Sequence, residues 1–310
     1  MSGSVLEILA PSARHDSIEG SIGNTPLIRL TRVVDDVPAG IEVYAKAEHL
    51  NPGGSVKDRP ALAMILAGEE SGTLRPGRTI LEATSGNTGI ALGMIGAARG
   101  YPVTICLPRN ASSQRKRILG SFGVEIIETD PLLATDGAQS IARELFEQHP
   151  DYYFYPDQYN NDANWRAHYQ GTALEIWSQT RGRISHFVAG IGTSGTFMGV
   201  TRRLRELNPG IQSVSMQPDS PLHGLEGLKH MASAVVPGIY DAKLADQNVE
   251  VATEDALAMV SRLARQEGLL VGPSSGANVL AAVRLAQTLS PGSVVVTILC
   301  ERGERSGNGE

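Results

Sequence analysis

The chain of 310 residues contains only two cysteines, five lysines and no long hydrophobic stretch. Cys106 and Cys300 lie in separate strand-like stretches without a neighbouring cysteine, which excludes a disulfide framework and a Cys-x-x-Cys metal site. We expect both to be small, reduced core residues. No uncharged stretch is long enough to cross a membrane, and the apolar residues 5–9 include Glu7, so no signal peptide is expected. These features predict a cytoplasmic protein.

Positive charge is also scarce. The 33 Asp and Glu residues outnumber the 27 Lys and Arg residues, which gives a formal net charge of -6. No basic tract is present, and a nucleic-acid partner would require clustered Lys and Arg to neutralise its phosphates. We therefore expect no nucleic-acid partner. The length exceeds what one hydrophobic core usually serves, so two domains are expected.

Short apolar stretches alternate with amphipathic helical patterns along most of the chain. This alternation is typical of an α/β protein whose sheets are mostly parallel. We predict two domains, each built on an open, twisted sheet. The smaller N-terminal domain would cover residues 41–155, and the larger would combine residues 12–40 with 156–300. A stretch rich in Tyr, Asn and Asp at residues 151–162 marks their junction, and residues 301–310 are expected to form a disordered tail.

The stretch Asn51-Pro-Gly-Gly-Ser-Val-Lys57-Asp-Arg-Pro connects a strand-like stretch to an apolar helical pattern. Its glycines and proline predict a loop, which places Lys57 where the loop enters a helix. The positive end of a helix disfavours an ammonium group, so this lysine could be neutral and form a Schiff base with a carbonyl compound. A solvated lysine at a helix start is the more common situation for a lysine considered alone.

A glycine-rich turn, Gly190-Ile-Gly-Thr-Ser-Gly-Thr196, follows another predicted strand and opens a helix. Residues 192–196 combine consecutive N–H groups, hydroxyls and a helix N-terminus, which suits a phosphate group. The turn also matches the G-x-G-x-x-G pattern of dinucleotide sites. However, Met216-Gln-Pro stands where an acid would be expected about twenty residues further on. A single phosphate monoester is therefore favoured, and a dinucleotide or a turn without a ligand are the alternatives.

Two further loops contain small polar residues. Residues 84–89, Thr-Ser-Gly-Asn-Thr-Gly, offer hydroxyls, an amide and N–H groups without charge, which suits a carboxylate or a ring hydroxyl. This loop and Pro273-Ser-Ser-Gly could instead provide only helix caps. Ligands of open parallel sheets lie beyond the carboxyl ends of the strands, where such loops gather. A phosphate site, a Schiff-base lysine and neutral polar loops together indicate pyridoxal 5'-phosphate.

These segments resemble the O-acetylserine sulfhydrylase (cysteine synthase) family of fold-type II pyridoxal-phosphate enzymes. The resemblance is carried, in the family's order, by Ile22-Gly-Asn-Thr-Pro-Leu, Asn51-Pro-Gly-Gly-Ser-Val-Lys-Asp-Arg, Glu82-Ala-Thr-Ser-Gly-Asn-Thr-Gly, Asp157-Gln-Tyr-Asn-Asn, Gly190-Ile-Gly-Thr-Ser-Gly-Thr and Pro273-Ser-Ser-Gly-Ala. Residues 171–177, 216–218 and 299–305 look most like the B-type branch. The chain departs from the family after Arg305, where Ser-Gly-Asn-Gly-Glu replaces the usual Tyr-Leu-Ser and longer tail.

The resemblance implies a role for each residue of these motifs, and it implies no metal. Lys57 would hold the cofactor as a Schiff base and later take the Cα proton of the substrate. Ser274 would face the pyridine nitrogen, where a hydroxyl, unlike an aspartate, makes the ring a weaker electron sink and favours loss of a β-leaving group. The other implied positions are Asn87 at the ring hydroxyl, Gly192, Thr193, Ser194, Gly195 and Thr196 at the phosphate, and Thr84, Ser85, Thr88 and Gln158 at the substrate α-carboxylate.

The reaction implied by this resemblance is β-replacement in cysteine biosynthesis. O-acetyl-L-serine would lose acetate to give an enzyme-bound aminoacrylate, and sulfide or thiosulfate would add to give L-cysteine or S-sulfocysteine. A homodimer is implied as well. The alternatives are a serine/threonine dehydratase or cystathionine β-synthase of the same fold, a nicotinamide-dependent oxidoreductase, and a non-catalytic paralogue. The sequence leaves open the preferred sulfur donor and the choice between O-acetylserine and O-phosphoserine.

Overall fold

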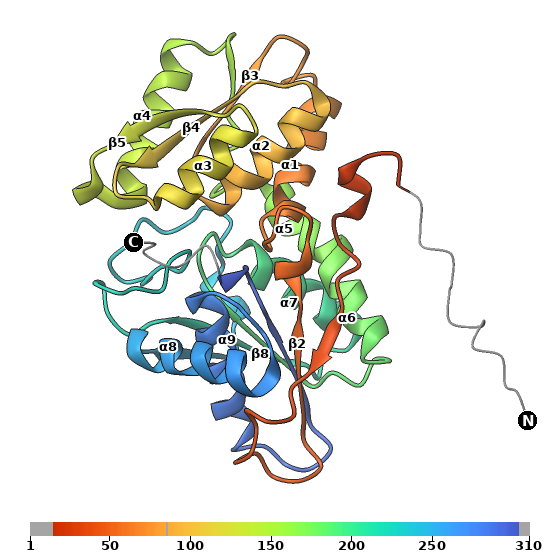
Figure 1. The fold of residues 1–310 in the computed structure, drawn as a ribbon. Helices are drawn as coiled ribbons and strands as arrows, with labels where there is room; N and C mark the ends of the chain where they lie inside the picture. Colours follow the sequence, from red (N-terminus) through yellow and green to blue (C-terminus); the bar gives the residue numbers. More distant parts are fainter. Residues whose placement is uncertain (1–14, 85, 304–310) are drawn as a thin grey trace, which may run out of the picture.

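The computed structural model describes residues 15–84 and 86–303, which form two sheets with helices packed around them (Figure 1). The strands are β1 (Leu27–Arg29), β2 (Glu42–Lys46), β3 (Thr79–Ala83), β4 (Val103–Pro108), β5 (Glu125–Thr129), β6 (Tyr153–Phe154), β7 (His186–Gly190), β8 (Gln212–Pro218), β9 (Gln247–Val251) and β10 (Val294–Ile298). One sheet has the order β1-β2-β10-β7-β8-β9, and the other has the order β5-β4-β3-β6. Neighbouring strands are parallel except for the antiparallel pair β1 and β2. This confirms the predicted α/β class with mostly parallel sheets.

Helices connect most of the strands and are divided between the two sheets. The α-helices are α1 (Asp58–Glu70), α2 (Asn87–Arg99), α3 (Ser113–Ser121), α4 (Ala134–Gln148), α5 (Asp162–Ala167), α6 (Ala173–Gln179), α7 (Gly195–Leu207), α8 (Thr253–Arg262) and α9 (Pro273–Ala286). Shorter 3-10 turns are η2 (Ile18–Ser21), η3 (Glu48–Leu50), η4 (Pro131–Leu133) and η6 (Ala242–Leu244), and η5 (His168–Thr172) and η7 (Leu263–Glu267) are π-helical. In Figure 1, the four-stranded sheet with α2, α3 and α4 lies above the six-stranded sheet with α8 and α9.

Both sheets are covered on their two faces, so the central strands β3, β4 and β10 are buried along their whole length. In β10, Val295 packs into the core that includes α8 and α9, and Val296 packs into the core that includes α6 and α7. In β3, Ile80 packs with residues of α1 and α2, whereas Leu81 packs with residues of α4. Successive strand residues point to opposite faces, so each sheet lies between two hydrophobic cores.

Local signals determine where several helices begin and end. The Ser112 hydroxyl caps α3 by accepting a hydrogen bond from the Arg115 backbone N–H at 3.3 Å. Gly100 ends α2 with a φ of 76°. Pro273 is the first residue of α9, a position where its missing N–H has no consequence. Helices α2 and α7 begin soon after the carboxyl ends of β3 and β7, so their N-termini open at the edge where ligands of such sheets bind.

The observed sheets differ from the predicted domain boundary at residue 41. Strand β2 pairs with β10, with Glu42 opposite Val294 and Lys46 opposite Ile298, so it belongs to the six-stranded sheet and the four-stranded sheet begins at β3. The predicted tail also differs over residues 301–303, because Glu301 and Arg302 form isolated β-bridges. Residues 304–310 of that tail, and residues 12–14 of the predicted larger domain, lie outside the described residues.

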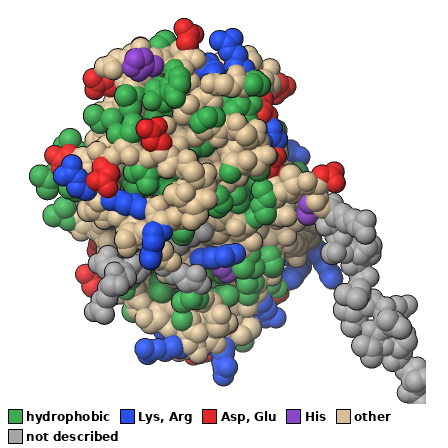
Figure 2. Space-filling view, turned by 45° about the horizontal axis from the view of Figure 1, so that its top comes forward, with side chains coloured by type: hydrophobic (Ala, Val, Ile, Leu, Met, Phe, Trp, Pro, Cys, Tyr) green, Lys and Arg blue, Asp and Glu red, His purple; other side chains and the backbone are tan. Residues whose placement is uncertain are grey.

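The surface shows no dominant charge on the face in Figure 2, where acidic and basic side chains are interspersed with hydrophobic ones. Within residues 15–84 and 86–303, no helix combines the length and apolar character needed to span a membrane. The same residues contain no group of three or more His, Cys, Asp or Glu side chains arranged to hold a metal ion.

Candidate active site

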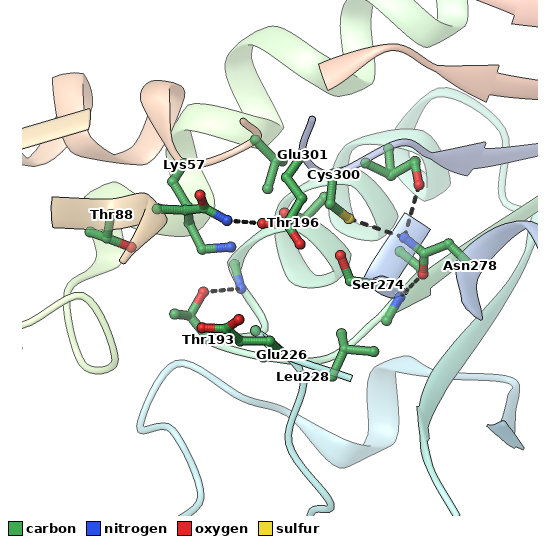
Figure 3. A pocket seen from close by; sticks show the side chains of 18 of the residues that line it. Lys57, Thr88, Thr193, Thr196, Glu226, Leu228, Ser274, Asn278, Cys300 and Glu301 are labelled. Carbon is green, nitrogen blue, oxygen red and sulfur yellow. Dashed lines mark hydrogen bonds between the residues drawn. The ribbon is translucent and has the colours of Figure 1, made fainter. Parts of the chain in front are cut away.

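One cavity lies where the loop before α1 meets the loops that follow β3, β7 and β10 (Figure 3). These loops follow the carboxyl ends of parallel strands, as expected for a ligand site of this fold. The cavity is lined by all of the residues predicted to bind the cofactor, namely Lys57, Asn87, Gly192, Thr193, Ser194, Gly195, Thr196 and Ser274. Thr84 and Thr88, predicted to bind the substrate, line it as well.

Lys57 stands directly before α1 and is partly buried. Its backbone N–H donates a hydrogen bond to Ser55 Oγ at 3.2 Å, and its side chain extends into the cavity (Figure 3). The amine is therefore near the positive end of α1 and reaches into a cavity. This position differs from that of a freely solvated surface lysine.

The helix that carries Lys57 is anchored by a buried ion-pair network. Arg59 is 7% exposed, and it donates to Glu48 Oε2 and to Glu175 Oε1, each at 2.7 Å. Lys46 Nζ lies 2.5 Å from Glu175 Oε2. Burial alone would raise the pKa of Glu175, but its hydrogen bonds and charge interactions with Arg59 and Lys46 lower the pKa to about 2. The buried charges satisfy one another, which fixes the start of α1.

Residues 192–196, which form the turn after β7 and the start of α7, make a narrow loop that we call the cradle. A Cβ at Gly192 would lie 1.9 Å from the Gly227 carbonyl oxygen, and one at Gly195 would lie 1.9 Å from Asn164 Oδ1, so both positions require glycine. Ser194 has a φ of 71°, and its buried Oγ has no hydrogen-bond partner among the described residues. The first N–H groups of α7 have no acceptor within the helix. Such donors at a helix N-terminus fit a phosphate group.

Neutral side chains contact the threonine hydroxyls of this cradle. Asn164 Nδ2 donates to Thr193 Oγ1 at 3.2 Å, and His168 Nε2 lies 3.3 Å from Thr196 Oγ1. Burial lowers the pKa of His168 to about 3, so its ring is neutral near pH 7 and brings no positive charge to the cradle. The attraction for an anion therefore comes mainly from N–H and hydroxyl groups.

A second cavity adjoins the first and shares Lys57, Thr84 and Thr88 with it. Gln158 lines this second cavity. Its Oε1 accepts a hydrogen bond from Thr88 Oγ1 at 2.8 Å, and its Nε2 donates to the Ala83 carbonyl at 3.0 Å. The structure thus brings together three of the four residues predicted at the substrate carboxylate. The fourth, Ser85, lies outside the described residues.

Glu82 is buried, and its side chain forms hydrogen bonds with the backbone near these residues. Its two carboxyl oxygens accept hydrogen bonds from the N–H groups of Ala83 at 2.8 Å and Gln158 at 3.1 Å. Burial raises the pKa of Glu82 to about 8, so the carboxyl group is mostly protonated near pH 7. A neutral Glu82 therefore connects the end of β3 to the segment that carries Gln158.

Residues 18–301 match the sequence model of a protein family, the pyridoxal-phosphate dependent enzymes. The chain belongs to this family. This pyridoxal-phosphate dependent enzyme is 50% identical to the cysteine synthase of Aquifex aeolicus (strain VF5) over 288 residues, which are 92% of this chain and 88% of the relative. It is 41% identical to cysteine synthase B of Salmonella typhimurium (strain LT2) over 94% of each chain. The crystal structure of a cysteine synthase from Entamoeba histolytica is similar with a TM-score of 0.91 at 34% identity, covering 97% of this chain and 92% of that one.

The residues in the cavity fit the cofactor of this family. The glycine cradle and the unpartnered Ser194 hydroxyl suit its phosphate, and Lys57 provides an amine in the same cavity. The family match also decides against a nicotinamide-dependent oxidoreductase. The G-x-G-x-x-G pattern at Gly190 therefore belongs to a pyridoxal-phosphate enzyme, which shows how weak that pattern is alone.

Further residues that were not predicted to belong to the site also line the cavity of this pyridoxal-phosphate dependent enzyme, among them the polar residues Glu226, Asn278, Cys300 and Glu301. Cys300 corrects the expectation of two core cysteines: Cys106 is buried, but Cys300 is partly exposed and lines the cavity. Cys300 and Glu301 follow the last strand, whose carboxyl end was a signal for a ligand site. Glu226 lies outside regular structure between β8 and β9, and the sequence offers no comparable signal for it.

Proposed function

We propose that this pyridoxal-phosphate dependent enzyme forms L-cysteine by β-replacement, with O-acetyl-L-serine as the amino-acid substrate and sulfide as the sulfur donor. Acetate leaves the β-carbon, and the sulfur of the donor forms the new bond to that carbon. The observation that carries the proposal is the meeting of Lys57 with the residue 192–196 cradle in one cavity, which adjoins the cavity that Gln158 lines. The cysteine synthases of Aquifex aeolicus and Salmonella typhimurium, similar over nearly the whole chain, support the choice of reaction.

Pyridoxal phosphate, when bound, supplies an electron sink for the electrons released at the substrate Cα. In our proposal Lys57 holds the cofactor through its amine, and the same amine, once free, takes the Cα proton. Residues 192–196 hold the phosphate, Asn87 binds the ring oxygen, and Ser274 faces the ring nitrogen. A hydroxyl at Ser274 leaves that nitrogen without a fixed proton, which favours loss of a β-leaving group over other reactions at Cα.

Thr84, Thr88 and Gln158 form the proposed site for the substrate α-carboxylate, together with Ser85. These are neutral polar residues close to the start of α2, where the helix N-terminus favours a negative charge. The Gln158 amide is held by Thr88 and by the Ala83 carbonyl, so its orientation is fixed before the substrate arrives. The proposed carboxylate site therefore relies on neutral polar side chains and on the N-terminus of α2.

The experiment that tests this reaction is a direct assay for L-cysteine and acetate from O-acetyl-L-serine and sulfide. Lys57→Ala should leave a folded protein without product formation, because the amine that holds the cofactor and takes the proton is gone. Lys243→Ala, which changes an exposed lysine that lines neither of the two cavities, is the matched control and should retain activity. Equal turnover by the two variants would contradict the role of Lys57. Release of pyruvate or a 2-oxo acid as the main product would instead indicate a dehydratase.

Three finer points belong to the same proposal. The B-type resemblance and the similarity to cysteine synthase B support thiosulfate as a second sulfur donor, with S-sulfocysteine as its product. A homodimer follows from the family resemblance and is tested by light scattering on the holoenzyme. The unpaired cysteines Cys106 and Cys300 suit a reducing cytoplasm, which cell fractionation would test.

A further inference from the structure

A buried acid without an assigned role follows the last strand. Glu301 is 3% exposed and lines the cavity together with Lys57 and Asn87. Its backbone is held by neighbours on two sides, because the Val56 N–H donates to the Cys300 carbonyl at 2.7 Å and the Gly272 N–H donates to the Glu301 carbonyl at 3.2 Å. The backbone that carries this carboxyl group is therefore held by the loop that carries Lys57 and by the start of α9.

The carboxyl group of Glu301 contacts the side-chain amide of Asn87. Asn87 Nδ2 donates a hydrogen bond to Glu301 Oε2. Asn87 Oδ1 and Glu301 Oε1 are buried and have no hydrogen-bond partner among the described residues. The NH2 group has two hydrogens, so one remains available after this bond. Both unpartnered atoms are acceptors, so the remaining N–H of Asn87 is the group of this pair that can bind an acceptor oxygen.

The charges around Glu301 show that it is not a simple stabilising ion pair. Arg115 and Lys57 are the nearby cations, and Glu226, which pairs with Arg115, is a nearby acid. Burial raises the pKa of Glu301, although Arg115 and the Asn87 hydrogen bond oppose this effect. A buried acid with one direct partner contributes little net stability, so its placement beside Asn87 calls for a functional reason.

We propose that Glu301 is a positioning residue that orients Asn87 for cofactor binding. A carboxyl oxygen that accepts a hydrogen bond distinguishes the two ends of the amide, because only Nδ2 can donate to it. Glu301 thus holds Asn87 with its second N–H available to an acceptor oxygen on the cofactor ring, and it disfavours the flipped amide that would present Oδ1. This inference rests on the proposed function, which places Asn87 at that ring oxygen.

The test is the affinity of the apo-protein for pyridoxal 5'-phosphate, measured by fluorescence titration. Glu301→Gln keeps the shape but can satisfy either end of the Asn87 amide, so affinity should fall about tenfold, the worth of one well-oriented hydrogen bond. Asn87→Ala should weaken binding at least as much. Glu301→Gln should cause no further loss in the Asn87→Ala background, because its partner is gone. Unchanged affinity of Glu301→Gln, or the same loss in both backgrounds, would overturn the inference.

Glu226→Gln is the matched control, since it changes an acid that lines the same cavity but pairs with Arg115. Its effect on affinity should be the same with and without Asn87. Circular dichroism of each variant establishes that the fold is retained. Measurements on the parent protein distinguish a failure of this inference from a failure of the proposed function. If the parent binds the cofactor and forms cysteine, a normal cofactor affinity of Glu301→Gln would overturn only the role of Glu301. A parent protein that binds no pyridoxal phosphate would overturn the proposed function together with this inference.

Discussion

Gly192→Ala should prevent the cradle between β7 and α7 from closing around a phosphate. The new Cβ would lie 1.9 Å from the Gly227 carbonyl oxygen, whereas ordinary contacts begin at 3.4 Å, so the two segments would have to separate by about 1.5 Å. The obstacle is backbone, and no side-chain rotation relieves it. A misplacement of about 1 Å in an active site can lower the reaction rate about a hundredfold, which shows how strongly such sites depend on position. We therefore expect affinity for pyridoxal phosphate to fall by about two orders of magnitude.

The assay is a titration of the apo-protein with pyridoxal 5'-phosphate, followed by its absorption and by protein fluorescence. Gly120→Ala is the matched control, because Gly120 lies in α3 and a Cβ there meets no atom within 4 Å. This control should bind the cofactor normally and gain up to about 1 kcal/mol in stability, since alanine favours the helix. Equal affinities of the two glycine variants would refute the assignment of the cradle to the phosphate.

Three further variants test other parts of the site. Gln158→Ala should raise the KM for O-acetyl-L-serine about tenfold or more, the worth of a hydrogen bond to a charged group, with unchanged cofactor titration; a loss of cofactor affinity instead would contradict its place at the substrate. Glu82→Gln should become increasingly stabilising relative to the parent as pH rises from 4.5 towards about 8, because burial raises the pKa of Glu82 over this range. In this pH range the carboxyl group is ionised in the unfolded parent protein and protonated in the folded one, so the free energy of unfolding of the parent falls by up to about 1.4 kcal/mol per pH unit. The same dependence of the unfolding free energy on pH in both proteins, measured by urea unfolding, would contradict this. Arg59→Met should destabilise the protein by about 3 to 5 kcal/mol because it leaves buried carboxylates unpaired. The control Arg284→Met, which changes an exposed arginine, should have little effect. Equal losses of unfolding free energy in the two variants, measured by urea unfolding, would contradict a special role for the buried network.

The residues predicted for the site lie in short contiguous motifs. Glycine, hydroxyl residues and a helix start are local features, and the rule that parallel strands gather their ligand at their carboxyl ends joins them in space. Lys57 and the residue 192–196 turn were predicted in this way, whereas Asn87 and Ser274 were predicted from the family resemblance, and all of them line one cavity in the structure. Their individual roles remain predictions that the variants above test.

Strand order could not be predicted in the same way, because it depends on pairing between distant segments. β2 reads as a neighbour of the strands that follow it, yet it pairs with β10 at the other end of the chain. β6 has only two residues, and β9 is polar and half-exposed, so neither shows the hydrophobic pattern of a strand. Glu301 was assigned to the tail for the same reason, because its bridge to Ser55 depends on a contact far away in the sequence.

The central claim is best tested by the visible absorption spectrum of the purified protein loaded with pyridoxal phosphate, before and after adding O-acetyl-L-serine without a sulfur donor. The account predicts that the cofactor band shifts on adding this substrate, that acetate is released, and that the original band returns when sulfide is added and cysteine forms. A cofactor band that does not respond to O-acetyl-L-serine would contradict the proposed substrate.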